Sequence, residues 1–140
     1  MIPKRNAQII ANWWTDQLRK AAPPRIDNGE IKDKEFDAMA ELMGLPRPAA
    51  NQGISDDQLK TFKRCLTWIL LREEDFDISV DYDPDGWLLE AAEVAGIDLG
   101  YKLPIKTVTL VETLQVREGY SGELKDIEIK DHWELNDEPN

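Results

Sequence analysis

The sequence predicts a single α+β domain in which N-terminal helices pack on a small, mostly antiparallel sheet of three or four strands, with one further helix after the first strand. Stretches with the helical spacing of apolar residues come first, and most stretches with strand-like alternation lie in the second half of the chain. The length of 140 residues and a hydrophobic fraction of 41% suit one domain with its own core. We expect this domain to span residues 1–130 and residues 131–140 to form a frayed polar tail.

Charge and cysteine content argue against several classes of protein. The net charge of −11 disfavours direct binding to nucleic acid or to anionic membranes, because both surfaces attract basic proteins. The charge is also uneven, since residues 1–25 carry five basic side chains and one acidic side chain. Cys65 is the only cysteine, so no internal disulfide can form. The chain shows neither a signal peptide nor an apolar run of transmembrane length, and we expect a cytoplasmic protein.

Two helices are predicted in the first 43 residues of the chain. Residues 4–22 carry apolar side chains at helical spacing, and the Pro-Pro pair that follows cannot continue the helix. Trp13 and Trp14 point about 100° apart on such a helix, so both reach the core only if the helix is largely covered. We expect both in the core, with an exposed binding anchor as the alternative. Residues 32–43 form the second predicted helix.

A third helix is predicted from Ser55 onwards. Gln58 stands three residues after Ser55, which is the spacing of a capping box, and two aspartates in the first turn complement the helix dipole. Cys65 flanks the buried stripe, so we expect an inert thiol rather than a nucleophile. The predicted stripe consists of Leu59, Phe62, Leu66, Ile69 and Leu70.

The centre of the chain predicts a strand that leads through an acidic turn into a helix. Apolar and polar residues alternate over residues 76–82, as in a half-buried strand. Asp83 is the expected N-cap of the following helix, with Pro84 at the first helical position. The helix is expected to run to Ala95, and Gly96 is placed for a left-handed C-cap.

The remaining strands follow that helix. Residues 105–112 are rich in valine and threonine and are expected to pair with residues 114–120 as a hairpin. Residues 123–130 alternate in the manner of an edge strand.

Acidic side chains are concentrated around the central strand and helix. Residues 73–98 hold ten carboxylates and neither lysine nor arginine. Such crowding costs self-repulsion, and it predicts a negative surface that attracts a basic protein partner, although many acidic runs are simply solvated faces. The expected partner-binding residues are Glu73, Glu74, Asp75, Asp77, Asp81, Asp83, Asp85 and Glu90, and Glu93 belongs to the same strip.

The same stretch opens like a calcium-binding loop. Asp81, Asp83, Asp85 and Gly86 fit the D-x-D-x-D-G pattern, in which alternate carboxylates converge on one cation. The twelfth position is Ala92 rather than the bidentate glutamate, so the second half of the pattern fails. We therefore expect no metal and no other cofactor, and keep a calcium-binding module as an alternative.

A small-ligand site is the other alternative. Lys106, Thr107, Arg117 and Tyr120 can lie together on the predicted hairpin, where a cation, a hydroxyl and an aromatic ring suit a nucleotide or another small anion. Ordinary cross-strand pairing would explain the same residues. The hypothesis from this set is a protein that sequesters a nucleotide signal.

No catalytic motif is evident in the sequence, and we expect a protein that is not an enzyme. The segments ANWWTDQLRK, VDYDPDGWLLEAAEVAGI, KLPIKTVTL and EGY resemble small acidic proteins of phages and prophages. Proteins of this type include inhibitors of host defence such as anti-CRISPR proteins. The resemblance implies an inhibitor that mimics DNA with its acidic surface and blocks a basic, nucleic-acid-binding host protein such as a nuclease effector, in the host cytosol. It transfers no functional residues.

Overall fold

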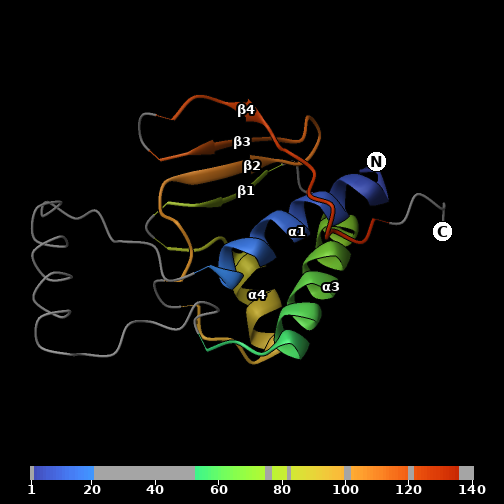
Figure 1. Cartoon of the computed structure of the whole chain (residues 1–140), viewed down its shortest axis with the longest axis vertical. Helices are drawn as coiled ribbons and strands as arrows, with labels where there is room; N and C mark the ends of the chain where they lie inside the picture. The colour runs from blue at the N-terminus through green and yellow to red at the C-terminus, as the bar shows by residue number, and fades with distance from the viewer. Residues whose placement is uncertain are drawn as a thin grey trace, which may run out of the picture.

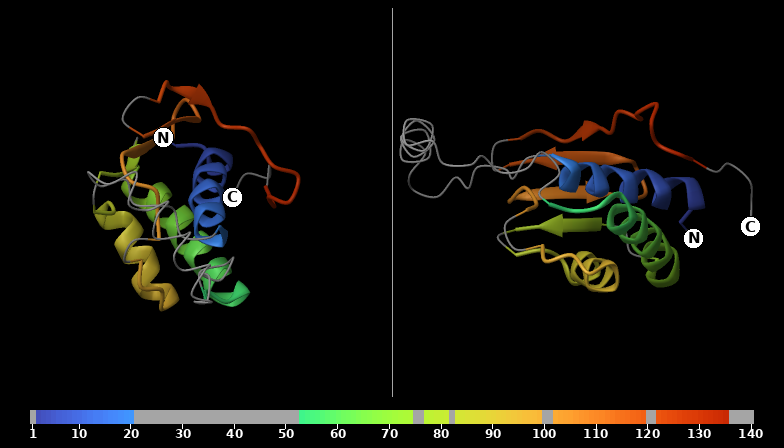
Figure 2. Two further views of the ribbon diagram at one scale, coloured as in Figure 1. Left: turned by 60° about the vertical axis from the view of Figure 1, so that its left-hand side comes forward. Right: turned by 60° about the horizontal axis from the view of Figure 1, so that its bottom comes forward.

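The computed structural model describes residues 2–20, 53–74, 77–81, 83–99, 102–119 and 122–135. Within these ranges, three helices gather on one side of a four-stranded antiparallel sheet whose strand order is β1-β2-β3-β4 (Figures 1 and 2). The α+β prediction is therefore confirmed, including the helix after the first strand. The helix expected over residues 32–43 lies outside the described residues.

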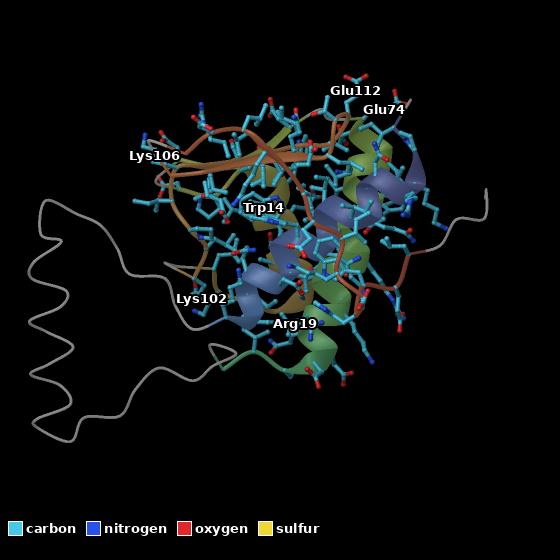
Figure 3. All side chains as sticks on the ribbon, turned by 45° about the horizontal axis from the view of Figure 1, so that its top comes forward. Trp14, Arg19, Glu74, Lys102, Lys106 and Glu112 are labelled. Carbon is cyan, nitrogen blue, oxygen red and sulfur yellow. The ribbon has the colours of Figure 1, made fainter. Side chains whose placement is uncertain are left out.

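Helix α1, Lys4–Arg19, crosses beneath the sheet (Figure 3) and is covered on most of its surface. Trp14 is fully buried and Trp13 is 8% exposed, with their rings in edge contact at 4.8 Å, so the prediction that both lie in the core is confirmed. The indole Nε1 of Trp14 donates to Thr109 Oγ1 of the sheet at 2.8 Å. The helix ends at Arg19 rather than at residue 22, because Lys20 is already extended.

Helix α3, Asp56–Glu73, begins with the predicted capping box, in which Ser55 and Gln58 each accept a backbone N–H from the other. Its predicted stripe is buried throughout. The Gln58 amide also donates to Gly96 O at the end of α4, Gly86–Ala95, so the two helices pack antiparallel. Gly96 has φ +70°, which confirms the left-handed C-cap.

The connection between β1, Asp77–Val80, and α4 corrects one prediction. Asp85, not Asp83, is the N-cap, and its carboxylate accepts the Trp87 N–H at 3.0 Å. Pro84 forms a bridge with Val80, and Asp85 N donates to Ser79 O at 3.0 Å. The chain thus stays paired with β1 through Pro84, which delays the first helical residue to Gly86.

Strands β2, Thr107–Leu110, and β3, Gln115–Glu118, form the predicted hairpin, and β2 also pairs with β1. The edge strand β4, Lys125–Asp126, is shorter than the predicted residues 123–130. Alternation places Ile78, Thr109 and Val116 on the helix-covered face, where all three are buried.

The C-terminal segment is held against α1. Trp133 is 6% exposed, and its Nε1 donates to Asp16 Oδ2 at 2.7 Å. His132 Nε2 lies 3.0 Å from the same oxygen. The prediction of a frayed tail over 131–140 is therefore wrong for residues 131–135, because the Trp133 ring has a place in the core; residues 136–140 lie outside the described residues.

Candidate functional site

The structure assigns ion-pair or capping contacts to four of the eight predicted partner-binding residues. The Arg72 guanidinium lies 2.6 Å from Glu73 Oε1 and 3.2 Å from Glu90 Oε2, which links α3 to α4. Hydrogen bonding to Glu90 raises the pKa of Arg72 further, so this charge persists at physiological pH. Lys106 pairs with Asp81, and Asp85 is the α4 cap. These four carboxylates are therefore partly neutralised within the protein.

Three further members of the set, Glu74, Asp77 and Asp83, are exposed and have no ion-pair partner among the described residues. Asp75 lies outside those residues. Glu93, on α4, is likewise exposed and unpaired within the described part of the chain. These four residues, Glu74, Asp77, Asp83 and Glu93, are called the open carboxylates below.

The acidic residues follow the length of β1 rather than forming one compact cluster. Glu74 lies at one end of the sheet and Lys106, the partner of Asp81, lies at the other end (Figure 3). The four-residue step from Asp77 to Asp81 corresponds to about 13 Å of extended chain. Any partner that contacts both ends must therefore span the length of β1, whose outer edge is partly occupied by the Pro84–Asp85 segment.

The calcium alternative receives no support from the described residues. Among them, no group of three or more histidine, cysteine, aspartate or glutamate side chains is arranged to hold a metal ion. Asp81 is engaged by Lys106 and Asp85 by the α4 N-terminus, so two of the three proposed ligands already have structural partners.

The predicted small-ligand residues do come together in part. Lys106, Thr107 and Arg117 line one shallow pocket of about 420 Å³ at an end of the sheet, while Tyr120 lies outside the described residues. The Lys106 charge is paired with Asp81, and the buried Thr107 hydroxyl donates to Ile105 O at 3.1 Å. Within the described part of the chain, Arg117 is the one cation of this pocket without an ion-pair partner.

A larger groove of about 520 Å³, not anticipated from the sequence, runs between α1, α3 and the C-terminal segment. Its cations come from two helices and its histidine from the segment after β4. Lys60, Lys63 and Arg64 of α3 have no ion-pair partner among the described residues. The excess of basic over acidic residues within residues 1–25 was the only feature of the sequence that pointed to this groove. The ionisable side chains that line the groove are Lys4, Arg19, Lys60, Lys63, Arg64, His132 and Glu134.

Trp68 is the most exposed tryptophan described and stands at the edge of this groove. Its side chain is 58% exposed, yet the Arg72 guanidinium lies 4.6 Å from the ring centroid and 5.9 Å from that of Trp87. A cation over an aromatic ring is a stabilising arrangement, and Glu90 holds Arg72 in turn. The Trp68 ring is thus presented to solvent in a fixed position.

The surroundings of Cys65 disfavour the thiolate form of its side chain. Burial raises the pKa of the Cys65 thiol, the nearby Glu90 carboxylate raises it further, and Arg72 opposes both effects. A raised pKa leaves little thiolate at neutral pH, which is the opposite of what a cysteine nucleophile requires.

Comparison with models of known protein families gives no match. A comparison with curated proteins also gives no match. None of the helices in the described ranges has both the length and the apolar character needed to cross a membrane.

Proposed function

We propose that the protein is a non-enzymatic inhibitor that binds a basic protein partner through the open carboxylates along β1 and α4. The partner class that fits this chemistry is a nucleic-acid-binding host defence protein, such as a nuclease effector, and the resemblance to phage proteins suggests the same, an anti-CRISPR-like role. In this proposal the carboxylates occupy positions at which a nucleic-acid ligand would place phosphates.

The main support for the proposal is that, among the described residues, no basic side chain forms an ion pair with Glu74, Asp77 or Asp83. Each is exposed, and within the described residues none has a basic neighbour at ion-pair distance. The chain places lysine and arginine beside Glu73, Asp81 and Glu90, so it neutralises acidic groups elsewhere in the same segment. Leaving the others unpaired costs repulsion that a basic partner would relieve.

The outer face of α4 adds apolar side chains next to one open carboxylate, Glu93. Leu89 is 48% exposed and Val94 is 62% exposed, and the exposed Glu93 lies between them on the helix surface. Single exposed apolar residues are common on protein surfaces. Leu89 shares one helix face with Glu93, four residues further on, and apolar contacts are what a protein interface needs in addition to charge steering.

The proposed set of binding residues is narrower than the set expected from the sequence. Glu73 and Glu90 are held by Arg72, and Asp81 by Lys106, so their charges contribute less to long-range attraction. Glu74, Asp77 and Asp83 are the residues whose removal should matter most.

The test compares two variants that lose the same charge. The first carries Glu74→Gln, Asp77→Asn and Asp83→Asn; the second carries Glu123→Gln, Asp126→Asn and Glu128→Gln, which are exposed in the C-terminal region. Affinity capture from the natural host, with wild type alongside, should recover a basic protein that the first variant loses and the second retains. Equal recovery by both variants would reject this surface, and recovery of no basic protein by wild type would reject the proposed function.

A further inference from the structure

The groove between α1 and α3 has a charge that contrasts with the rest of the molecule. The whole chain carries 28 acidic and 17 basic residues, yet the groove is lined by five lysine or arginine side chains and one carboxylate, that of Glu134. Of the five cations, Arg19 is already 3.6 Å from Asp16. The α3 cations therefore dominate the charge that is open to a ligand.

Lys60, Lys63 and Arg64 are spaced three and four residues apart, so they are neighbours on one face of α3. Like charges at this spacing repel one another and destabilise a helix. None of the three has an ion-pair partner among the described residues, although acidic residues are abundant in the chain. An anion bound in the groove would relieve this repulsion.

Trp68 lies one turn beyond Arg64 on the same helix and lines the same groove. Its 58% exposed ring is fixed by Arg72, as described above. An exposed aromatic ring next to a cluster of cations is the combination that binds a nucleobase together with its phosphates. A simple inorganic anion has no aromatic face that could stack on the Trp68 ring.

Asn12 supplies a buried polar group on the opposite wall. Its residue is only 5% exposed and lines the groove from α1, and its Nδ2 donates to Gln8 O at 2.9 Å. Its Oδ1 has no hydrogen-bond partner among the described residues. A buried acceptor of this kind normally requires a partner, and a base amino group would provide one.

We propose that this groove binds a nucleotide-sized ligand, with its phosphates on Lys60, Lys63 and Arg64 and its base against Trp68. The volume of about 520 Å³ lies within the range of small-molecule sites. A long polyanion is disfavoured, because the strongly acidic remainder of the chain would repel the parts that extend beyond the groove. The site is distinct from the open carboxylates and from the Lys106–Arg117 pocket.

Calorimetric titration with the four ribonucleoside diphosphates, and with pyrophosphate and adenosine, tests the proposal. At least one nucleoside diphosphate should bind wild-type protein more tightly than pyrophosphate or adenosine does, because it uses both the cations and the ring. Lys60→Ala/Lys63→Ala/Arg64→Ala should weaken that binding by about tenfold or more. Trp68→Ala should weaken nucleotide binding but leave pyrophosphate binding within about twofold.

The control variant, Lys102→Ala/Lys125→Ala/Lys130→Ala, removes the same charge outside the groove and should bind like wild type. Photo-crosslinking of an azido-nucleoside diphosphate to wild type should label a peptide of α3, a readout that does not depend on the folding of a variant. No nucleoside diphosphate binding at about 1 mM would overturn the proposal. So would binding that is lost equally in the control variant, labelling confined to other peptides, or tighter binding of a dT oligonucleotide than of any nucleotide.

Discussion

The indole Nε1 of Trp14 donates to Thr109 Oγ1 at 2.8 Å, and the Thr109 hydroxyl donates in turn to Ile78 O at 3.1 Å. This chain of two hydrogen bonds joins α1 to two strands inside the core, where Trp14 and Thr109 are both fully buried. It fixes where the first helix sits beneath the sheet.

Thr109→Val should lower the free energy of unfolding by about 1–3 kcal/mol, because it removes both hydrogen bonds and leaves the buried Trp14 indole N–H without its acceptor. In a Trp14→Phe background the same change should cost less, since no buried indole N–H is then left without an acceptor. Urea denaturation of the four proteins in this cycle measures the coupling. Thr67→Val, at a half-buried helical threonine, is the control and should cost less than about 0.5 kcal/mol. If the losses of unfolding free energy in the two single variants simply add in the double variant, the proposed coupling between Trp14 and Thr109 is contradicted.

Asp85→Ala should lower the free energy of unfolding by about 1 kcal/mol, because the Trp87 N–H loses its capping carboxylate. Asp83→Ala is the matched control, two residues away and equally acidic, and should change stability by less than about 0.5 kcal/mol. Thermal unfolding of both variants distinguishes the two aspartates. A larger loss at Asp83 than at Asp85 would restore the assignment that the sequence suggested.

The two aspartates also show how far sequence reasoning reached. Asp83 followed by Pro84 has the residue types of an N-cap and a first helical position, and local chemistry alone cannot distinguish it from Asp85. The choice is made by pairing with β1, since the Val80–Pro84 bridge and the Asp85 N–Ser79 O bond keep this segment extended. By contrast, the Ser55 capping box and the Gly96 C-cap depend on neighbouring residues only, and both were predicted correctly.

The groove was missed for a related reason. Its walls come from α1 and α3 and its rim from residues near 132, so nothing within one short stretch of sequence brings the cations together. The tail was misjudged because its polar residues outnumber Trp133, whereas burial of that one ring decides where the segment lies. Both predictions failed because the contacts that decide them join residues far apart in the sequence, which residue types alone do not reveal.

Asp16→Ala should release the C-terminal segment, because Asp16 accepts the Trp133 indole N–H at 2.7 Å and also contacts His132. The expected cost is about 1–3 kcal/mol of unfolding free energy, with faster proteolytic cleavage after β4. Limited proteolysis followed by mass spectrometry reports the cleavage sites. Glu134→Ala, at an exposed neighbour of Trp133, should leave the cleavage pattern unchanged. An unaltered pattern in the Asp16 variant would show that the hydrogen bond does not hold the segment.

The Cys65 thiol should react with iodoacetamide more slowly at pH 8 than a cysteine in an unfolded peptide, because its raised pKa reduces the thiolate fraction. Glu90→Gln removes a negative charge that raises this pKa, so the variant should react faster and its rate profile should shift to lower pH. Glu93→Gln removes an equal charge on the same helix and should have little effect. Identical pH–rate profiles for wild type and Glu90→Gln would contradict this electrostatic effect.

The most direct test of the acidic-surface proposal is the salt dependence of binding to the captured partner. The logarithm of the dissociation constant should rise with the logarithm of salt concentration for wild type, and the slope should be clearly shallower for Glu74→Gln/Asp77→Asn/Asp83→Asn. The charge-matched C-terminal variant should keep the wild-type slope. Equal slopes for all three proteins would contradict the claim that the open carboxylates bind the partner.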